Sequence, residues 1–239
     1  MVHYQPLAFD GSESNIPSEF IRPDDEKPCL DAPELVIPTI DLGTLRCWSD
    51  PPALSKAAEA VSEACKRHGF FLVVNHGVDL GLIDKAHQYM DVFFGLQISE
   101  KQKAQRKVGD SYGYASSFVG RFSSKLPWKE TLSFRFCPRT QNIVQNYMQA
   151  LTNGVYKSCI HRAVVNNRVA RRSLAFFLCP KMDITVTVAQ GLVNAANPRR
   201  YPDFTWASLL EFTQRHYRAD MKTLDAFSKW VQQRESTEK

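Results

Sequence analysis

A histidine, an arginine and a serine in the C-terminal third of the chain have spacing that could bring them together. His161 and Arg171 are ten residues apart, on either side of an Asn-Asn pair that favours a turn. If the segments 155–165 and 171–179 form an antiparallel hairpin, His161 and Arg171 face each other across the strands. Ser173 then shares the face of Arg171. The spacing therefore predicts one patch that holds an imidazole, a guanidinium and a hydroxyl.

The three residue types suggest what such a patch could bind. Arginine holds a carboxylate through two parallel hydrogen bonds, and a serine hydroxyl can donate a third. A neutral imidazole beside them is a natural ligand for a transition metal. On spacing alone, a structural pair of His161 and Arg171 in the core or at the surface is the commoner alternative.

The spacing of apolar residues predicts the elements that must position this patch. An extended run at 35–43 contains Pro38, which indicates an edge strand. A helix follows to about residue 68, with Asp50 as its cap, and 70–75 is expected to be a fully buried strand. The remaining expected elements are a helix from Asp79, a third helix with the capping box Ser99 and Gln102, a loop at 109–122, a strand at 126–136 and a long amphipathic helix from Thr205.

Composition limits the class of protein. The 239 residues carry a net charge of +5 and are 44% hydrophobic, which is typical of a globular chain. The basic residues are too dispersed for a nucleic-acid footprint, and no run approaches the roughly 18 apolar residues of a membrane helix. The N-terminal stretch does not have the pattern of a secretory signal. The six cysteines show no zinc-like spacing and predict reduced, mostly buried thiols in the cytoplasm.

Five segments of the sequence carry a resemblance to a known family. They are HGFFLVVNHG (68–77), GYASSFVGRFSSK (113–125), LPWKETLSF (126–134), TNGVYKSCIHRAVVN (152–166) and NPRRYPDFTWASLLEFTQRHYRADMKTLDAF (197–227). Together they resemble the plant gibberellin 20-oxidases, a family of iron(II)- and 2-oxoglutarate-dependent dioxygenases. The LPWKETLSF string is specific to that family, whereas a histidine followed by Arg-x-Ser belongs to the whole superfamily.

The resemblance implies a fold, a reaction and roles for three residues. The implied fold class is α+β, an incomplete double-stranded β-helix (jelly roll) with flanking helices. The implied reaction is oxidation of carbon-20 of a gibberellin precursor with Fe(II), 2-oxoglutarate and O2, with ascorbate as a candidate reductant. By resemblance, His161 is the distal iron ligand, and Arg171 and Ser173 bind the far carboxylate of 2-oxoglutarate. The implied partner is the gibberellin precursor, a small molecule, with no nucleic acid and no membrane.

The sequence also departs from the family pattern. Iron is held in the family by a His-x-Asp pair and one distal histidine, but none of the six histidines here is followed two positions later by Asp or Glu. The tyrosine-rich segment that precedes this pair in relatives is also absent. QNIVQNYMQ (141–149) runs directly into ALTNG (150–154), which predicts an internal deletion near Met148–Ala150.

Two interpretations remain open at this point. The first is an active gibberellin-oxidising enzyme, which the missing iron ligands argue against. The second is a non-catalytic form, produced by skipped exons or a mis-joined gene model, that acts through partner binding if it acts at all. The chain is expected to comprise a loosely ordered N-terminal arm (1–34), an N-terminal α/β region (35–149) and the remaining part of the jelly roll with a terminal helix (150–239). Loss of strands should expose sheet edges and favour aggregation.

Other residues could belong to a site, each with a structural alternative. Asp84, His87 and Asp91 share a helix face and could bind a metal, although solvated charges are the commoner case. His76 is expected to be a hydrogen-bonded turn histidine. Cys159 and Cys179 have no partner for nucleophilic catalysis and are expected to be buried thiols.

The family-specific string leaves its own question open. Trp128, Lys129 and Glu130 could face the gibberellin pocket. Alternatively, Trp128 packs in the interior and the two charged residues form a surface pair.

Overall fold

The computed structural model describes most of the chain as two compact units. The described residues are 16, 18–27, 29, 31–45, 50–107, 110–116, 127–134, 148–161, 163–164, 169–216 and 221–237. Unit 1 comprises Met1–Ala32, Asp79–Arg139 and Ala163–Leu174, and unit 2 comprises Pro33–Val78, Thr140–Arg162 and Ala175–Lys239. The start of the predicted arm, the end of the predicted loop at 109–122 and the Asn-Asn turn lie outside the described residues. The three regions expected from the sequence stay a prediction.

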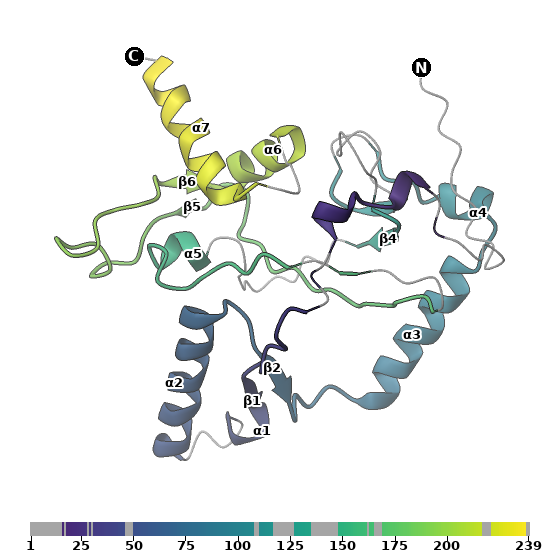
Figure 1. The fold of residues 1–239 in the computed structure, drawn as a ribbon, viewed down its shortest axis with the longest axis horizontal. Helices are drawn as coiled ribbons and strands as arrows, with labels where there is room; N and C mark the ends of the chain where they lie inside the picture. Colours follow the sequence, from purple (N-terminus) through teal and green to yellow (C-terminus); the bar gives the residue numbers. More distant parts are fainter. Residues whose placement is uncertain are drawn as a thin grey trace. The chain divides into compact units, whose positions relative to one another are not determined.

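Unit 1 combines helices with one antiparallel hairpin (Figure 1). Strands β3 and β4 pair in the register Gly113↔Ser133 to Ser116↔Glu130. The strand at 113–116 corrects the expected loop, because pairing with β4 supplies hydrogen bonds that local sequence does not reveal. Its elements are the 3-10 turns η1 (Ser18–Phe20) and η2 (Asp24–Glu26), the helices α3 (Leu80–Phe94) and α4 (Ile98–Gln102), and the strands β3 (Gly113–Ser116) and β4 (Glu130–Ser133).

The helix starts in unit 1 follow the capping rules in one case and not in the other. The Asp79 carboxylate accepts a hydrogen bond from the Leu82 amide at 2.9 Å, so α3 begins where the sequence predicts. Helix α4 begins one residue before Ser99, with Gln97 at the cap position and no side-chain cap bond. The predicted capping box at Ser99 is therefore wrong.

Unit 2 contains two small strand pairs and the remaining helices (Figure 1). Strands β1 and β2 are parallel, and β5 and β6 are antiparallel. The Asp50 carboxylate accepts from the Ala53 amide at 3.1 Å, which confirms the predicted cap of α2. The elements are β1 (Thr39–Asp41), α1 (Leu42–Leu45), α2 (Pro51–Arg67), β2 (Leu72–Val74), α5 (Met148–Leu151), β5 (Thr185–Val186), β6 (Phe204–Thr205), α6 (Trp206–His216) and α7 (Thr223–Thr237).

The core of unit 2 lies around α5, the β5–β6 pair and the two C-terminal helices. Phe227 is fully buried, and its ring lies 5.0 Å from that of Phe204 and 5.5 Å from that of Phe212. The buried set is Ala150, Val186, Tyr201, Phe204, Leu209, Phe212 and Phe227. The sequence predicts one long helix here, and the structure has two, so the apolar stripe folds back on itself and buries its own aromatic residues.

Asn153 ties the loop after α5 to this core. Its side chain is fully buried and its φ is 52°. The side-chain amide donates to the carbonyl oxygens of Leu192, Asn197 and Pro198 at 3.4, 3.3 and 3.0 Å, and its oxygen accepts from the Arg200 amide at 2.9 Å. Since a buried amide must be hydrogen-bonded, these contacts fix the chain just before the segment that carries His161.

Strand β2 differs from its prediction in burial. Leu72, Val73 and Val74 are 51%, 39% and 43% exposed, although the sequence predicts a fully buried strand. Parallel strands are normally covered on both faces. Within the described part of unit 2, β2 pairs with β1 in a two-stranded sheet. A strand with the sequence of a core element therefore lies at the surface.

Candidate functional site

His161 lies on an exposed, irregular segment of unit 2. Its Nδ1 is 3.3 Å from the carbonyl oxygen of Cys159, and a hydrogen bond between them requires the proton on Nδ1. That tautomer leaves the lone pair of Nε2 for a ligand, as in many histidines that bind metals. A single donor atom is thus available at this position.

Arg171 and Ser173 lie on an exposed segment that belongs to unit 1. The neighbouring Arg172 is held through its Nε, which lies 2.6 Å from Oδ1 of Asp91 on α3. Both partners of this ion pair are about half exposed, so it contributes little free energy. The pair nevertheless links the segment that carries Arg171 to the longest helix of unit 1.

The described residues of the two segments do not form the predicted hairpin. No described residue of 155–165 or 171–179 lies in a strand, and Leu178 takes part in an isolated bridge. The hairpin prediction is therefore wrong for this structure. A two-stranded hairpin is marginal in water without a third strand or a covered face. His161 belongs to unit 2, and Arg171 and Ser173 belong to unit 1. The roles of these three residues stay predictions from the resemblance.

The donor set does not fit a non-haem iron centre. Such a site needs two imidazoles and a carboxylate, because water competes effectively against fewer donors for this weakly binding ion. No group of three or more His, Cys, Asp and Glu residues that could hold a metal occurs in the part of the chain that the structure describes. Asp84, His87 and Asp91 on α3 therefore do not form such a group, and their candidate metal site is not supported. His76 is confirmed as a turn histidine, since its Nδ1 accepts from the Val78 amide at 3.1 Å.

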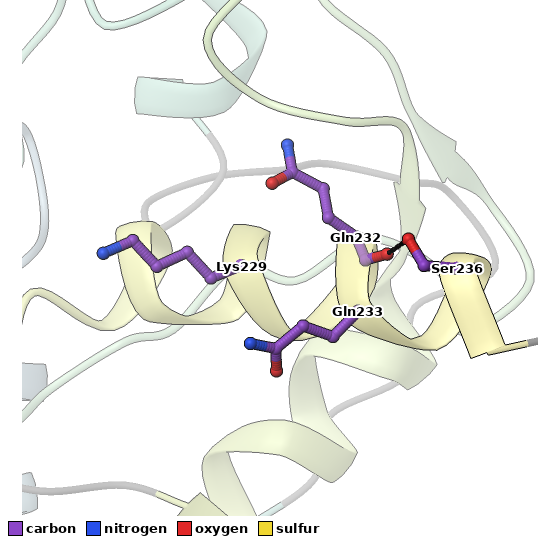
Figure 2. Close-up of a pocket in the computed structure, with 4 residues that line it drawn as sticks. All are labelled: Lys229, Gln232, Gln233 and Ser236. Atoms are coloured by element: carbon purple, nitrogen blue, oxygen red, sulfur yellow. Dashed lines mark hydrogen bonds between the residues drawn. The ribbon is translucent and has the colours of Figure 1, made fainter.

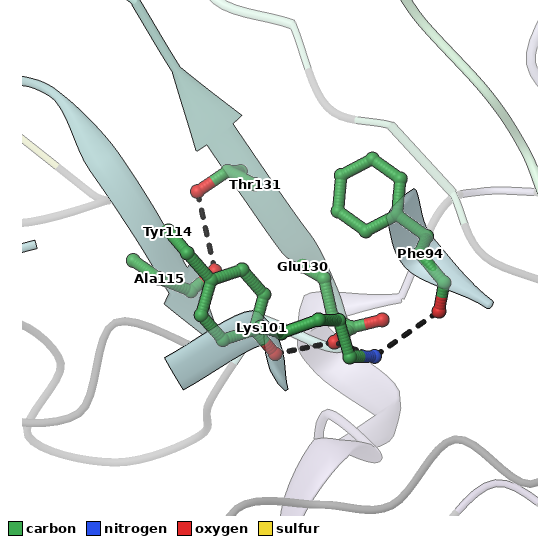
Figure 3. A network of polar contacts seen from close by, with 6 residues as sticks. All are labelled: Phe94, Lys101, Tyr114, Ala115, Glu130 and Thr131. Carbon is green, nitrogen blue, oxygen red and sulfur yellow. Dashed lines mark hydrogen bonds and ion pairs between the residues drawn. The ribbon is translucent and has the colours of Figure 1, made fainter. Parts of the chain in front are cut away.

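The family-specific string contributes a buried polar cluster to unit 1 (Figure 3). Lys101 on α4 is 4% exposed, and its Nζ lies 2.8 Å from Oε1 of Glu130 on β4. The same ammonium donates to the Phe94 carbonyl at 3.1 Å, and the Tyr114 hydroxyl donates to the same oxygen of Glu130. This cluster joins α3, α4 and both strands of the hairpin. Glu130 therefore has a buried structural contact, and the alternative of a surface pair with Lys129 is wrong.

Trp128 in the same string also packs within unit 1. Its ring stacks on that of Phe20 at 6.1 Å between centroids and with 20° between planes. Phe20 is 6% exposed, so part of the predicted N-terminal arm is an ordered part of the interior. Lys129 is exposed. Sequence reasoning missed Lys101, since a lysine in a Lys- and Gln-rich helix gives no signal of burial.

A shallow depression of about 380 Å³ lies along α7 (Figure 2). It is lined by Lys229, Gln232, Gln233 and Ser236, all from that one helix. The Ser236 hydroxyl donates to the Gln232 carbonyl at 2.9 Å. The lining offers no imidazole, thiol or carboxylate, so it does not resemble the metal site that the resemblance implies.

The four described cysteines form no disulfide, and their burial differs in part from the expectation. Cys179 is exposed and Cys159 is half-buried, so the expected burial of both thiols is wrong for Cys179. Cys29 is exposed as well. Partial burial raises the pKa of the Cys65 thiol, because the charged thiolate loses solvation there.

The helices of the described residues do not meet the requirements of a membrane span. None of them combines the length and the apolar character that a span requires.

Comparison with protein families and solved structures defines the class. Residues 37–152 match the N-terminal model of the non-haem dioxygenases in morphine synthesis, and residues 129–180 match the 2OG-Fe(II) oxygenase superfamily. A crystal structure of JOX2 in complex with 2OG, Fe and JA has a TM-score of 0.71 at 21% identity, and covers 92% of this chain and 95% of that one. The fold is that of the 2OG-Fe(II) oxygenases, an incomplete jelly roll with flanking helices.

Individual relatives narrow the assignment. Gibberellin 20 oxidase 1-D of Triticum aestivum is 39% identical over 341 positions, which cover 93% of this chain and 94% of the relative. Gibberellin 20 oxidase 1 of Arabidopsis thaliana is 38% identical over 350 positions, which cover 95% and 92%. The chain belongs to the gibberellin 20-oxidase family of 2-oxoglutarate- and iron(II)-dependent dioxygenases.

The same alignments indicate that part of the relatives' sequence has no counterpart here. The alignment with the wheat enzyme has 341 positions, and this chain has 239 residues. At least 102 positions of the alignment, the difference between the two numbers, therefore have no residue of this chain. Because the alignment spans 93% of this chain and 94% of the relative, these positions lie within it. The lengths agree with the internal deletion, and its place near Met148–Ala150 stays a prediction.

Proposed function

We propose that this chain is a non-catalytic member of the gibberellin 20-oxidase family. The observation that carries the proposal is the donor set, since no histidine is followed two residues later by Asp or Glu. His161 matches the distal ligand of the family, and its lone nitrogen gives Fe(II) too few donors to displace water. Without a bound metal the chain has nothing to activate O2, so it does not oxidise carbon-20 of a gibberellin precursor.

By resemblance, the chain keeps the two residues that bind 2-oxoglutarate in the family. Arg171 and Ser173 supply the guanidinium and hydroxyl that would hold the far carboxylate of 2-oxoglutarate. In the family the near end of that molecule depends on the iron. The proposal therefore includes weak 2-oxoglutarate binding through one carboxylate, without its decarboxylation to succinate.

A turnover assay on the purified chain tests the proposal. The chain is incubated with Fe(II), ascorbate, 2-oxoglutarate, O2 and a gibberellin precursor, and released CO2 and succinate are measured. The wheat gibberellin 20 oxidase 1-D is the positive control, and we expect no precursor-dependent CO2 above the protein-free rate from this chain. Precursor-dependent decarboxylation would refute the proposal.

Metal retention gives an independent measurement. The chain is dialysed anaerobically against Fe(II), then against metal-free buffer, and its iron content is determined beside that of the variant His161→Ala. We expect well under one iron per chain in both samples. Stoichiometric iron that disappears in His161→Ala would show that other side chains complete a site around this imidazole.

The proposal places the chain in the cytoplasm. The four described cysteines form no disulfide, which is typical of proteins in a reducing compartment. Extracellular or vesicular location of the tagged chain would contradict this part of the proposal.

A further inference from the structure

Unit 2 exposes an apolar segment that has the sequence of a core strand. Within Ala175–Cys179, Phe176 is 86% exposed, Phe177 is 79% exposed and Leu178 is 50% exposed. In an extended chain, adjacent side chains point to opposite sides. Exposure of both Phe176 and Phe177 therefore means that neither side is covered at these two residues.

Two other parts of unit 2 share this property. Ile160, next to His161, is 76% exposed, and β2 exposes Leu72, Val73 and Val74. Monomeric proteins rarely leave this many large apolar side chains uncovered unless another polypeptide packs on them. The exposed residues thus point to an absent layer of structure.

The alignments show that the relatives contain sequence that this chain lacks. At least 102 positions of the wheat relative have no counterpart in this chain, and they lie within the aligned span. The predicted junction near Met148–Ala150 falls at α5, and Ala150 is 2% exposed in the core of unit 2. The absent block would therefore enter at the same unit that carries the uncovered segment.

We propose that the Ala175–Cys179 segment is a docking surface for this absent block supplied as a separate polypeptide. The recognition is strand addition, in which main-chain hydrogen bonds give affinity and apolar pockets for alternate side chains give specificity. The inference rests on the proposed function, because both follow from the same missing block. The chain is then one part of a two-chain jelly roll.

Co-expression tests the inference. The full chain is produced together with an affinity-tagged polypeptide that comprises the unmatched block of the wheat gibberellin 20 oxidase 1-D. We expect the two to co-purify at a 1:1 ratio and the soluble yield of the chain to rise. Hydrogen exchange at Ala175–Leu178, measured by mass spectrometry, should slow at least tenfold in the complex.

Matched variants separate docking from a general effect on folding. Phe176→Asp with Phe177→Asp changes two side chains that are already exposed, so we expect the rest of unit 2 to fold and co-purification to fall at least tenfold. Tyr89→Asp, at a 74% exposed aromatic residue of α3, is the control and should leave binding unchanged.

The outcomes distinguish this inference from the proposed function. Failure of the block to co-purify, or unaltered exchange at Ala175–Leu178, overturns the inference and leaves the proposed function standing. A discrete homodimer that forms without the block, and dissociates when Phe176 and Phe177 are replaced, also overturns it, because the occupant is then a second copy. CO2 release by the chain alone overturns the proposed function, whichever way binding turns out.

Discussion

The buried ion pair of unit 1 offers the sharpest test of the structure. Lys101→Met keeps the length of the alkyl chain and removes the ammonium, so the Glu130 carboxylate stays buried without its countercharge. The two side chains are only 5% and 9% exposed, and water cannot replace the lost partner. We expect the β3–β4 hairpin to open far more often in the variant.

The magnitude follows from distance and burial. At 2.8 Å between Nζ and Oε1, the Coulomb attraction is about 6 kcal/mol for an effective dielectric constant of 20. Desolvation of the two ions offsets most of this, so the intact pair has a small net effect. Removing one partner leaves the remaining charge buried without compensation and lowers the free energy of unfolding by about 3–5 kcal/mol. A loss of about 3 kcal/mol accelerates hydrogen exchange more than 100-fold, since each 1.4 kcal/mol is a factor of ten.

A double-mutant cycle checks this reasoning. Exchange of the Gly113–Ser116 amides is measured at low protein concentration for Lys101→Met, Glu130→Gln and the double variant. We expect the double variant to be at least about 1 kcal/mol more stable than the sum of the single effects predicts, because both buried charges are then absent. Glutamine keeps an oxygen that can accept from the Tyr114 hydroxyl.

The surface pair of Lys103 and Glu100 is the control for the cycle. Its Nζ and Oε2 are 2.6 Å apart, but the side chains are 71% and 47% exposed. Lys103→Met should cost less than about 1 kcal/mol. Additive effects of Lys101→Met and Glu130→Gln, within about 0.5 kcal/mol, would refute the reasoning, since they would mean that both charges are solvated.

Two further predictions concern unit 2. Asn153→Ala removes four hydrogen bonds and places alanine at a φ of 52°, so we expect a loss of about 3 kcal/mol in urea unfolding. Asn153→Gly should lose less, and equal losses would contradict a conformational contribution. The raised pKa of Cys65 means that folding favours its protonated thiol, so its stabilising effect is present below the unfolded pKa and is lost as pH rises through the folded pKa. Iodoacetamide should therefore label Cys65 at higher pH in the folded chain than in urea, and coincident profiles would contradict this.

Local rules predicted the starts of two helices. The caps of α2 and α3 depend on one carboxylate and an amide three residues later, so Asp50 and Asp79 could be recognised in the sequence. The strands β1 and β4 were also expected, from extended runs of β-forming residues. The strand β3 was missed, because its pairing with β4 is a contact between segments that are distant in sequence.

Burial was predicted less well, for a physical reason. The runs FFLVVN and SLAFFLCP have the composition of covered strands, but cover comes from other parts of the chain. In the structure, Val73 and Phe177 are exposed. The same limit applies to Lys101, whose burial depends on Glu130, 29 residues away.

The sequence by itself determined the family and the absence of the His-x-Asp pair, because both are properties of residue order. The tertiary structure decided that Glu130 pairs with Lys101 in the interior and that 171–179 does not form the expected hairpin. Strand pairing and ion-pair burial depend on contacts between segments far apart in the chain, so no local pattern encodes them. For this reason, an apolar strand that its sequence assigns to a core lies at the surface.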